Sequence, residues 1–462
     1  MSTTDSTLIS LQRYLADSTG AVYIKDINLS GNQVTKDKII YRELEMQPGV
    51  LLPKQDIDEF FKSERNKLIN TDLFEEVNLS IEEEGKDSLN VHIAVKERWY
   101  TWPIPILELA DRNFNEWWNN RGGDFSRLQY GIMFKRRNFR GRKESLDLLM
   151  RFGFSNVFRI NYNIPFLDKQ QKTSLSFGAS YSETHTVAYA TKFNKFVEVS
   201  NEENVLQKQW AGYVSVGKRI GFYDYHRVSL GYSSGAIADT VAELNPNYFL
   251  GGRKSQKFFK LSYSYAKDMR DIRVYPLNGY FVRGSFEKNG LGVFDDLNSI
   301  VIEGDYFKYT PISKRFFHEL GATFKTSFPA LQPYQEMRAL GYTTKILRGY
   351  DNYVVEGQHL GIFKNTLRFK ALSKKLNLKK IIPLKYFSSI PIEVYLKSYA
   401  DAGYISSQVV TETNERLTNN LLLGWGTGVD VVTFYNTTFR LEYSLNKHDL
   451  SGAFYLYFKS TF

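Results

Sequence analysis

Strict alternation of polar and apolar residues dominates the chain from Trp99 to its end. In Phe439–Asn446 every second residue is apolar and every intervening residue is polar, and Phe259–Tyr265 and Tyr280–Glu287 repeat the pattern. Because successive side chains of a β-strand point to opposite faces of the sheet, these runs predict strands with one apolar and one polar face. We therefore expect a fold dominated by β-strands over residues 100–462.

About sixteen such segments can be counted, and they predict an antiparallel transmembrane β-barrel because their number is even and their connections are alternately short and long. A soluble β-sandwich would also alternate, but it would bury its apolar face. Tyr, Phe and Trp make up 15% of the chain and gather near strand ends, which favours the aromatic girdles of a membrane barrel. The predicted segments lie near 102–109, 126–137, 143–153, 156–165, 172–183, 206–219, 226–236, 255–267, 279–288, 298–310, 314–327, 360–372, 391–403, 420–433, 437–445 and 452–462.

Composition excludes several other classes of protein. No run of 18 apolar residues occurs, which excludes a transmembrane helix. The net charge of +10 is scattered along the chain, which indicates a solvated mixed surface and no nucleic-acid partner. Cysteine is absent and the six histidines are dispersed, so we expect neither disulfides nor a metal site. Met1–Ser10 lacks signal-peptide features, so if the protein is exported we expect the chain to be a processed form, to be a recombinant form, or to begin at a misplaced start.

The first hundred residues have a different texture. After a tail over 1–20, residues 21–99 predict a small α/β domain in the order β-α-α-β-β. A strand over 21–29 is followed by a helix that Thr35 can cap and by a second helix over 57–68. Two strands over 74–83 and 88–97 complete the unit.

This order resembles the POTRA domain, the periplasmic module of the BamA/TamA superfamily of outer-membrane β-barrel assembly and translocation proteins. The phrase Asn70–Val77 is similar to the family's link into its second strand, although Asp72 stands where a glycine is common. The resemblance implies a periplasmic domain whose open sheet edge receives extended client segments through main-chain hydrogen bonds. The alternative is a spacer domain whose edge is protected.

A long connection over 328–359 carries the motif Arg348-Gly349-Tyr350 and has no clear period of its own. In the superfamily, an Arg-Gly-aromatic motif on the sixth outer loop folds into the lumen and meets an acidic residue within an Asp-Ala-Gly phrase. Asp401 begins such a phrase, and the alternation of its strand predicts that it points inward. The resemblance thus implies an Arg348–Asp401 clamp. The alternative is an exposed loop cation and a solvated carboxylate.

The first and last predicted strands carry a second candidate site. Trp102 is followed by Pro103 and Pro105, which cannot donate hydrogen bonds to a neighbouring strand. The seam with the last strand should therefore be poor in hydrogen bonds and resembles the lateral gate of the family, unless the prolines only mark a linker. On the other side of the seam we expect Phe454, Phe458 and Phe462, in a segment that resembles the C-terminal signal of outer-membrane barrels.

Enzymatic chemistry finds little support in the sequence. Gly231-Tyr232-Ser233-Ser234-Gly235 matches the G-x-S-x-G motif, but it lies in an alternating segment without the following helix that a nucleophile elbow needs. No phosphate-binding or dinucleotide motif is present. We expect no enzyme activity, no catalytic residues and no cofactor.

The resemblance implies a protein of the bacterial outer membrane that inserts or assembles other barrels. Its expected partners are outer-membrane lipid or lipopolysaccharide, unfolded outer-membrane or secreted client proteins, and accessory periplasmic or lipoprotein subunits. A translocator of the two-partner-secretion type, which passes one exoprotein through its lumen, stays open as an alternative. A passive structural barrel or porin is the third.

Overall fold

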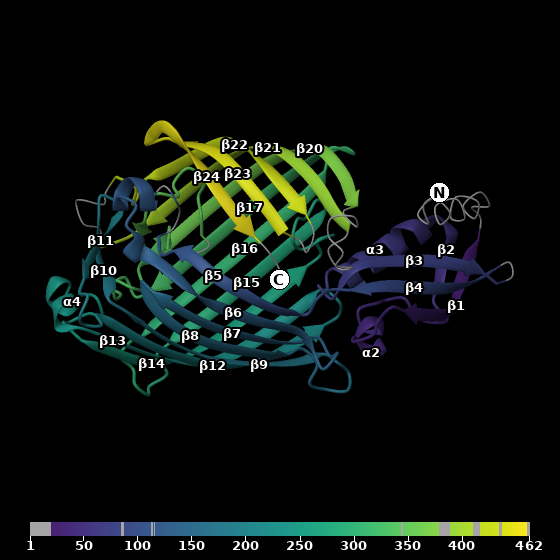
Figure 1. The fold of residues 1–462 in the computed structure, drawn as a ribbon, viewed down its shortest axis with the longest axis horizontal. Coiled ribbons are helices and arrows are strands. Elements are labelled where there is room, and N and C mark those ends of the chain that lie inside the picture. Colours follow the sequence, from purple (N-terminus) through teal and green to yellow (C-terminus); the bar gives the residue numbers. More distant parts are fainter. Residues whose placement is uncertain are drawn as a thin grey trace.

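A computed structural model describes residues 20–84, 87–111, 114, 116–342, 345–377, 389–409, 416–433 and 437–459. A large strand barrel and a small N-terminal domain lie side by side along the long axis of the molecule (Figure 1). Within the described residues, no helix is both long enough and apolar enough to cross a membrane.

The barrel is one antiparallel sheet of sixteen strands, and its strands follow one another in chain order. Each predicted segment corresponds to one of these strands, which confirms the predicted fold class. The strands are β5 (Thr101–Leu109), β6 (Leu128–Phe139), β7 (Glu144–Gly153), β8 (Ser155–Ile164), β9 (Thr173–Thr184), β12 (Gln207–Ile220), β13 (Asp224–Ile237), β14 (Ser255–Asp268), β15 (Gly279–Asn289), β16 (Ser299–Pro311), β17 (Phe316–Phe328), β20 (His359–Asn377), β21 (Ser389–Ser406), β22 (Leu421–Thr433), β23 (Thr437–Asn446) and β24 (Asp449–Lys459).

The two faces of the sheet are inverted relative to a soluble barrel. Outward residues such as Val214 and Val216 are exposed, whereas inward Ser215 is buried and its hydroxyl lies 2.6 Å from that of Ser229 on the next strand. An apolar outer face and a polar interior are what a barrel in a lipid bilayer requires.

Aromatic rings form belts at both ends of the barrel wall. At the end away from the N-terminal domain, five outward rings on five successive strands lie with neighbouring centroids 6.3, 5.6, 6.5 and 4.3 Å apart. These rings belong to Tyr130, Phe152, Phe158, Tyr181 and Trp210. At the other end, pairs such as Phe139–Tyr162 and Phe439–Phe458 take the same place. Such belts mark the two membrane interfaces.

The N-terminal domain has a four-stranded sheet in the order β2-β1-β4-β3, in which β1 and β4 run parallel. The structure adds the strand β2 to the predicted order, so the edge strands are β2 and β3. With three residues, β2 is too short to show alternation in the sequence. The elements are β1 (Ala21–Ser30), α2 (Asp37–Tyr41), β2 (Leu51–Pro53), η1 (Lys54–Asp56), α3 (Ile57–Ile69), β3 (Phe74–Glu83) and β4 (Ser88–Glu97).

The connections at the end of the barrel away from this domain contain small elements in addition to the sixteen predicted strands. A hairpin of β10 (Thr186–Lys192) and β11 (Lys195–Ser200) follows β9, and α4 (Asp239–Leu244) follows β13. The long connection contains the short pair β18 (Arg338–Leu340) and β19 (Val355–Glu356). The helical turns η2 (Glu116–Asn120) and η3 (Phe125–Arg127) lie between β5 and β6.

Candidate functional site

The long connection between β17 and β20 folds back into the barrel lumen. Leu347, Tyr350 and Val355 are almost fully buried and pack in one apolar cluster with residues of β20, β21 and β22. Burial of these side chains removes apolar surface from water, and this stabilises the loop inside the barrel. The loop therefore fills part of the lumen.

Arg348 and Asp401 meet inside this loop–wall interface. The Arg348 Nε donates to one Asp401 oxygen at 2.7 Å, and Nη2 donates to the other at 2.5 Å. Nη2 also donates to the Thr366 hydroxyl at 3.0 Å, and the guanidinium lies 3.9 Å from the centre of the Tyr399 ring. Both charged groups are buried. A bidentate pair of this kind fixes orientation, and removal of either partner leaves a buried charge without compensation.

Gly349 and Tyr350 connect the loop to the last strands of the barrel through close contacts and hydrogen bonds. Gly349 has a φ of +89°, and a Cβ there would lie 2.5 Å from the carbonyl oxygen of Leu445. Asn446 donates to the Gly349 carbonyl at 2.8 Å. The Tyr350 hydroxyl accepts from the Leu423 amide at 3.2 Å and lies 2.9 Å from His448 Nδ1. The motif thus contacts β22, β23 and the turn that follows β23.

Glycines on the wall make room for this motif. A Cβ on Gly424 would lie 1.9 Å from the Arg348 carbonyl oxygen, and one on Gly403 would lie 2.8 Å from Leu347. Sequence reasoning missed Gly424, Asn446 and Thr366 as part of the site. Glycines at 424, 426 and 428 share one face of β22, and that spacing was the available signal.

The loop is also tied to the last strand. The Tyr457 hydroxyl of β24 donates to the Asp351 carboxylate, whose other oxygen accepts from the Gly349 amide at 3.2 Å. This contact was not predicted, since nothing in the alternation of β24 distinguishes Tyr457 from Tyr455. It places the loop beside the free edge of the sheet.

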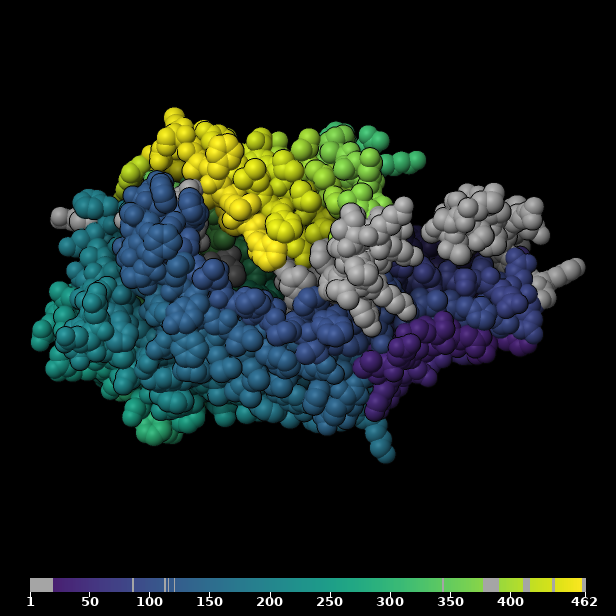
Figure 2. All heavy atoms as spheres, in the orientation of Figure 1, coloured from purple at the N-terminus to yellow at the C-terminus, as the bar shows by residue number. Residues whose placement is uncertain are grey.

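That free edge is the seam between β5 and β24. The hydrogen-bonded strand order ends at these two strands, and within residues 101–109 and 449–459 no ladder joins them. Figure 2 shows the wall hollowed between the yellow C-terminal strands and the blue first strands. Among the described residues, the ladder of the sheet is therefore interrupted at this position alone.

The two prolines lie inside β5 and not in a preceding linker. Pro103 is opposite Phe134 and Pro105 is opposite Ile132, in a pairing with β6 that runs from Thr101 to Leu109. Neighbouring residues of a strand direct their backbone groups to opposite sides. Because proline has no N–H, we place the donors to β6 on the alternate residues, which include Trp102, and the proline nitrogens on the seam side.

On the other side of the seam, Phe454 and Phe458 point outward and are exposed. Their rings lie 4.9 Å from Tyr443 and 5.1 Å from Phe439, both on β23. Phe462, the third residue predicted here, lies outside the described residues.

A network of charges lies below the clamp. Lys397 Nζ donates to Asp430 at 2.6 Å and to Glu442 at 2.5 Å, and Arg440 donates to Asp430 at 3.1 Å. With Arg348, several of these side chains line a lumen cavity of about 300 Å³. Each buried charge therefore has an opposite charge within hydrogen-bonding distance, as burial requires.

A turn between β14 and β15, residues 269–278, enters the lumen from the opposite end. Its Tyr275 is buried and donates from its hydroxyl to Asp430 at 2.9 Å. Arg368 stacks on the Tyr275 ring at 4.7 Å and donates to the Pro276 carbonyl at 3.0 Å. The turn therefore anchors in the same charge network that lies below Arg348.

The same turn contacts the N-terminal domain. Asn70, at the end of α3, donates to the Asp271 carbonyl at 2.8 Å and accepts from the Arg273 amide at 2.9 Å. A continuous set of contacts thus leads from α3 through Tyr275 to the wall beneath the clamp.

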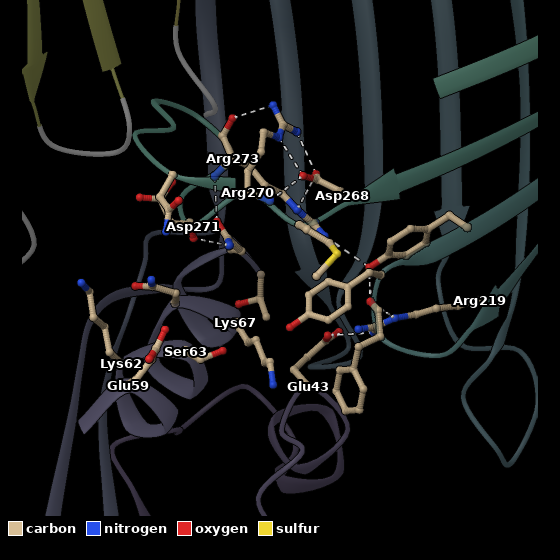
Figure 3. A pocket seen from close by; sticks show the side chains of 18 of the residues that line it. Glu43, Glu59, Lys62, Ser63, Lys67, Arg219, Asp268, Arg270, Asp271 and Arg273 are labelled. Atoms are coloured by element: carbon tan, nitrogen blue, oxygen red, sulfur yellow. Dashed lines mark hydrogen bonds and ion pairs between the residues drawn. The ribbon is translucent and has the colours of Figure 1, made fainter. Parts of the chain in front are cut away.

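Between α3 and the barrel mouth lies a pocket of about 470 Å³ (Figure 3). Beside it, Glu43 accepts from Arg42 at 2.9 Å and Arg219 at 2.8 Å, and Lys143 lies 3.4 Å away. Burial alone would raise the pKa of Glu43, but Lys143, Arg219 and Arg42 outweigh burial and lower its pKa to about 2. These charges hold the domain on the barrel.

The remaining sequence motif has no site geometry. Ser233 of the G-x-S-x-G match sits within β13 and is paired with Ala211 on one side and Phe258 on the other. A nucleophile elbow requires a sharp strand-to-helix turn, which this position lacks. Across the described part of the chain, no three His, Asp or Glu side chains lie together as metal ligands would.

Family comparisons agree with this architecture. The model of the Omp85 superfamily domain matches residues 138–449, and a POTRA model, described as a surface antigen variable number repeat, matches residues 22–98. The chain belongs to the Omp85 superfamily. Omp85 proteins are outer-membrane barrels with periplasmic POTRA domains, so the barrel spans the outer membrane and the domain of residues 22–98 lies in the periplasm. The belt of Tyr130 and Trp210 therefore marks the outer interface.

Two solved structures share the fold. BamA from Haemophilus ducreyi lacking POTRA domains 1–3 is 15% identical with a TM-score of 0.53, and the alignment covers 96% of this chain and 85% of that one. CdiB from Escherichia coli is 11% identical with a TM-score of 0.55, over 95% of this chain and 75% of that one. No curated protein sequence matches the chain significantly.

Proposed function

We propose that this Omp85 protein inserts β-strand client proteins into the outer membrane through the seam between β5 and β24. The observation that carries the proposal is that the ladder of a sixteen-stranded sheet stops at these two strands, within the described residues. An unpaired strand edge is a template for another strand. In a membrane, such an edge needs a partner, because lipid cannot satisfy backbone groups.

Along the whole seam-facing edge of β5 there are backbone carbonyl acceptors, but backbone N–H donors are present on only part of it. Every second residue of β5 directs its backbone groups to the seam, and these residues include Pro103, Pro105, Leu107 and Leu109. All of them present carbonyl groups, whereas the prolines present no N–H. A client strand would therefore pair most completely with the outer half of β5.

The proposal also depends on the contacts between the long connection and the last strands of the barrel. Arg348, Tyr350 and Asp351 connect the loop to β21, β22 and β24. These contacts hold the last strands together while the seam beside them opens. The POTRA domain would receive clients before this step, and its edge strand β3 offers a further unpaired edge for β-augmentation.

Disulfide locking of the seam tests the proposal, since the chain has no native cysteine. A panel of double variants places one cysteine within Trp102–Leu109 and one within Phe454–Phe458. The matched control is Ser215→Cys with Ser229→Cys, whose hydroxyls already lie 2.6 Å apart in an intact part of the sheet. The assay measures insertion of a small unfolded outer-membrane barrel into proteoliposomes, before and after reduction.

The proposal expects the seam disulfide to stop insertion, reductant to restore it, and the control disulfide to have no effect. Insertion that continues through a quantitatively locked seam would overturn it. That result would favour passage through the lumen, as in a two-partner-secretion translocator, for which the loop and the Tyr275 turn would have to leave the lumen.

A further inference from the structure

Four aromatic side chains gather in the outer loop that joins β5 to β6. The rings of Phe114 and Trp118 are stacked with centroids 6.0 Å apart, and Trp117 lies 5.6 Å from Phe114 and 5.5 Å from Phe125. Phe114 and Trp118 are each 60% exposed and Phe125 is 72% exposed. We call these four residues the loop cluster. Exposed aromatic patches of this kind mark interaction surfaces.

A polar scaffold holds the loop cluster in place. Buried Trp117 donates from its indole to the Asp124 carbonyl at 2.9 Å. Arg127 forms a bidentate pair with Asp111, with both N–O distances 2.8 Å, and contacts Glu198 of β11 at 3.0 Å. Arg121 contacts Glu198 at 3.2 Å. The charges of this scaffold are thus paired within the loop and with β11, and the rings of Phe114, Trp118 and Phe125 are exposed.

The outer aromatic belt leads directly to this loop. The belt runs across the wall from Trp210 on β12 to Tyr130 on β6. Tyr130 is opposite Leu107 of β5, and β5 has no aromatic residue near its outer end with which to continue the belt. Phe125 lies only five residues before Tyr130 in the chain. The loop cluster therefore follows the belt at the strand where the belt would otherwise stop.

From this continuity, we infer that the loop cluster is seated in the outer leaflet of the membrane, at the outer end of the β5–β24 seam, with lipid as its partner. Trp favours the interface between acyl chains and head groups, which accepts an apolar ring and a polar indole edge together, and the aromatic girdles of barrels lie at the same level. In Figure 2 the blue surface of this region forms part of the side wall beside the yellow C-terminal strands. The inference concerns lipid contact and stands whether or not the seam admits clients.

Two environment-sensitive fluorescent labels would test the lipid contact. Phe125→Cys places one label in the loop cluster, and Phe193→Cys places the other at the tip of the β10–β11 hairpin, where the next residue, Asn194, accepts from the Val354 amide of the long connection at 2.8 Å. Phe193 is 74% exposed, which matches the 72% of Phe125. Both variants are reconstituted into vesicles containing lipids brominated along their acyl chains, and iodide serves as the aqueous quencher. Heat-modifiable mobility on a gel confirms that each variant is folded.

The inference expects brominated lipid to quench the label at position 125 severalfold more strongly than the label at position 193, and iodide to show the opposite order. Equal quenching of both labels by iodide, with no effect of brominated lipid, would overturn it and assign the loop cluster to a partner in the aqueous phase.

A second measurement uses the native indole. The part of the tryptophan emission that Trp118→Phe removes should be quenched by brominated lipid and protected from iodide.

Discussion

Two segments enter the lumen of this barrel from opposite ends, and they are held in different ways. The outer loop brings an apolar cluster around Leu347 and a bidentate ion pair to the wall. The periplasmic turn over 269–278 is shorter, and it is held by the hydrogen bond from Tyr275 to Asp430 and by the contacts of Arg368 with Tyr275 and Pro276. The turn alone also contacts the POTRA domain, through Asn70. The comparison suggests a fixed outer anchor and a weaker inner connection to the domain that would receive clients.

The largest effect is expected at the outer anchor. Arg348→Ala and Asp401→Ala each leave a buried charge unpaired, which costs about 3–5 kcal/mol of stability. We expect lower thermal stability in heat-modifiability gels and impaired insertion, with normal membrane targeting because the last strand is intact. Arg348→Lys keeps the charge but loses the bidentate geometry, so its thermal stability should lie between that of the wild type and that of Arg348→Ala. If both alanine variants keep wild-type stability and activity, the clamp has no structural role.

At the domain junction, the lowered pKa of Glu43 predicts a pH dependence. A carboxyl whose pKa falls from 4.5 to about 2 on folding stabilises the folded state fully above pH 4.5. That contribution, about 3 kcal/mol, is lost as the pH falls from 4.5 to 2. In urea unfolding, the free energy of unfolding of the wild type should exceed that of Glu43→Gln by most of this amount at pH 7 and by clearly less at pH 3. A difference independent of pH would contradict this account.

A smaller effect should follow from Gly424→Ala. Its Cβ would overlap the Arg348 carbonyl, so the loop must shift, at a cost of about 1–3 kcal/mol. Gly284→Ala is the matched control, because a Cβ on this β15 glycine meets nothing within 4 Å. Thermal unfolding should separate the two variants. Equal melting of both would show that the loop does not need the space at Gly424.

The turn over 269–278 should contribute less to stability than the Arg348–Asp401 clamp. Tyr275→Phe removes one hydrogen bond to Asp430, which keeps Lys397 and Arg440 as partners, so we expect a loss of about 1 kcal/mol. If the turn couples domain and lumen, Asn70→Ala and Tyr275→Phe should be non-additive in a double-mutant cycle of unfolding free energies. Strict additivity would mean that the turn transmits nothing.

The strands could be predicted from alternation alone, whereas the pairing of Arg348 with Asp401 was predicted from the resemblance to a family, with alternation supporting only the direction of Asp401. Alternation is a property of each strand by itself, so it located all sixteen barrel strands and also turned Asp401 inward. It could not find Tyr275, Tyr457 or Asn70, because their importance comes from contacts between segments far apart in the chain. The strands β2, β18 and β19 were missed because two or three residues show no period. The hairpin β10–β11 does alternate, but its place in a long connection concealed it.

The prolines of β5 also bear on how a client would leave. A hybrid sheet over Pro103 and Pro105 would lack two hydrogen bonds at its periplasmic end, so separation should begin there and proceed outward. Replacing both prolines with valine should prolong the life of a client–β5 crosslinkable intermediate, and an unchanged lifetime would contradict this order of release. A first strand built in this way favours release of the client over its retention, since the end of the hybrid sheet that lacks hydrogen bonds is the easiest to separate.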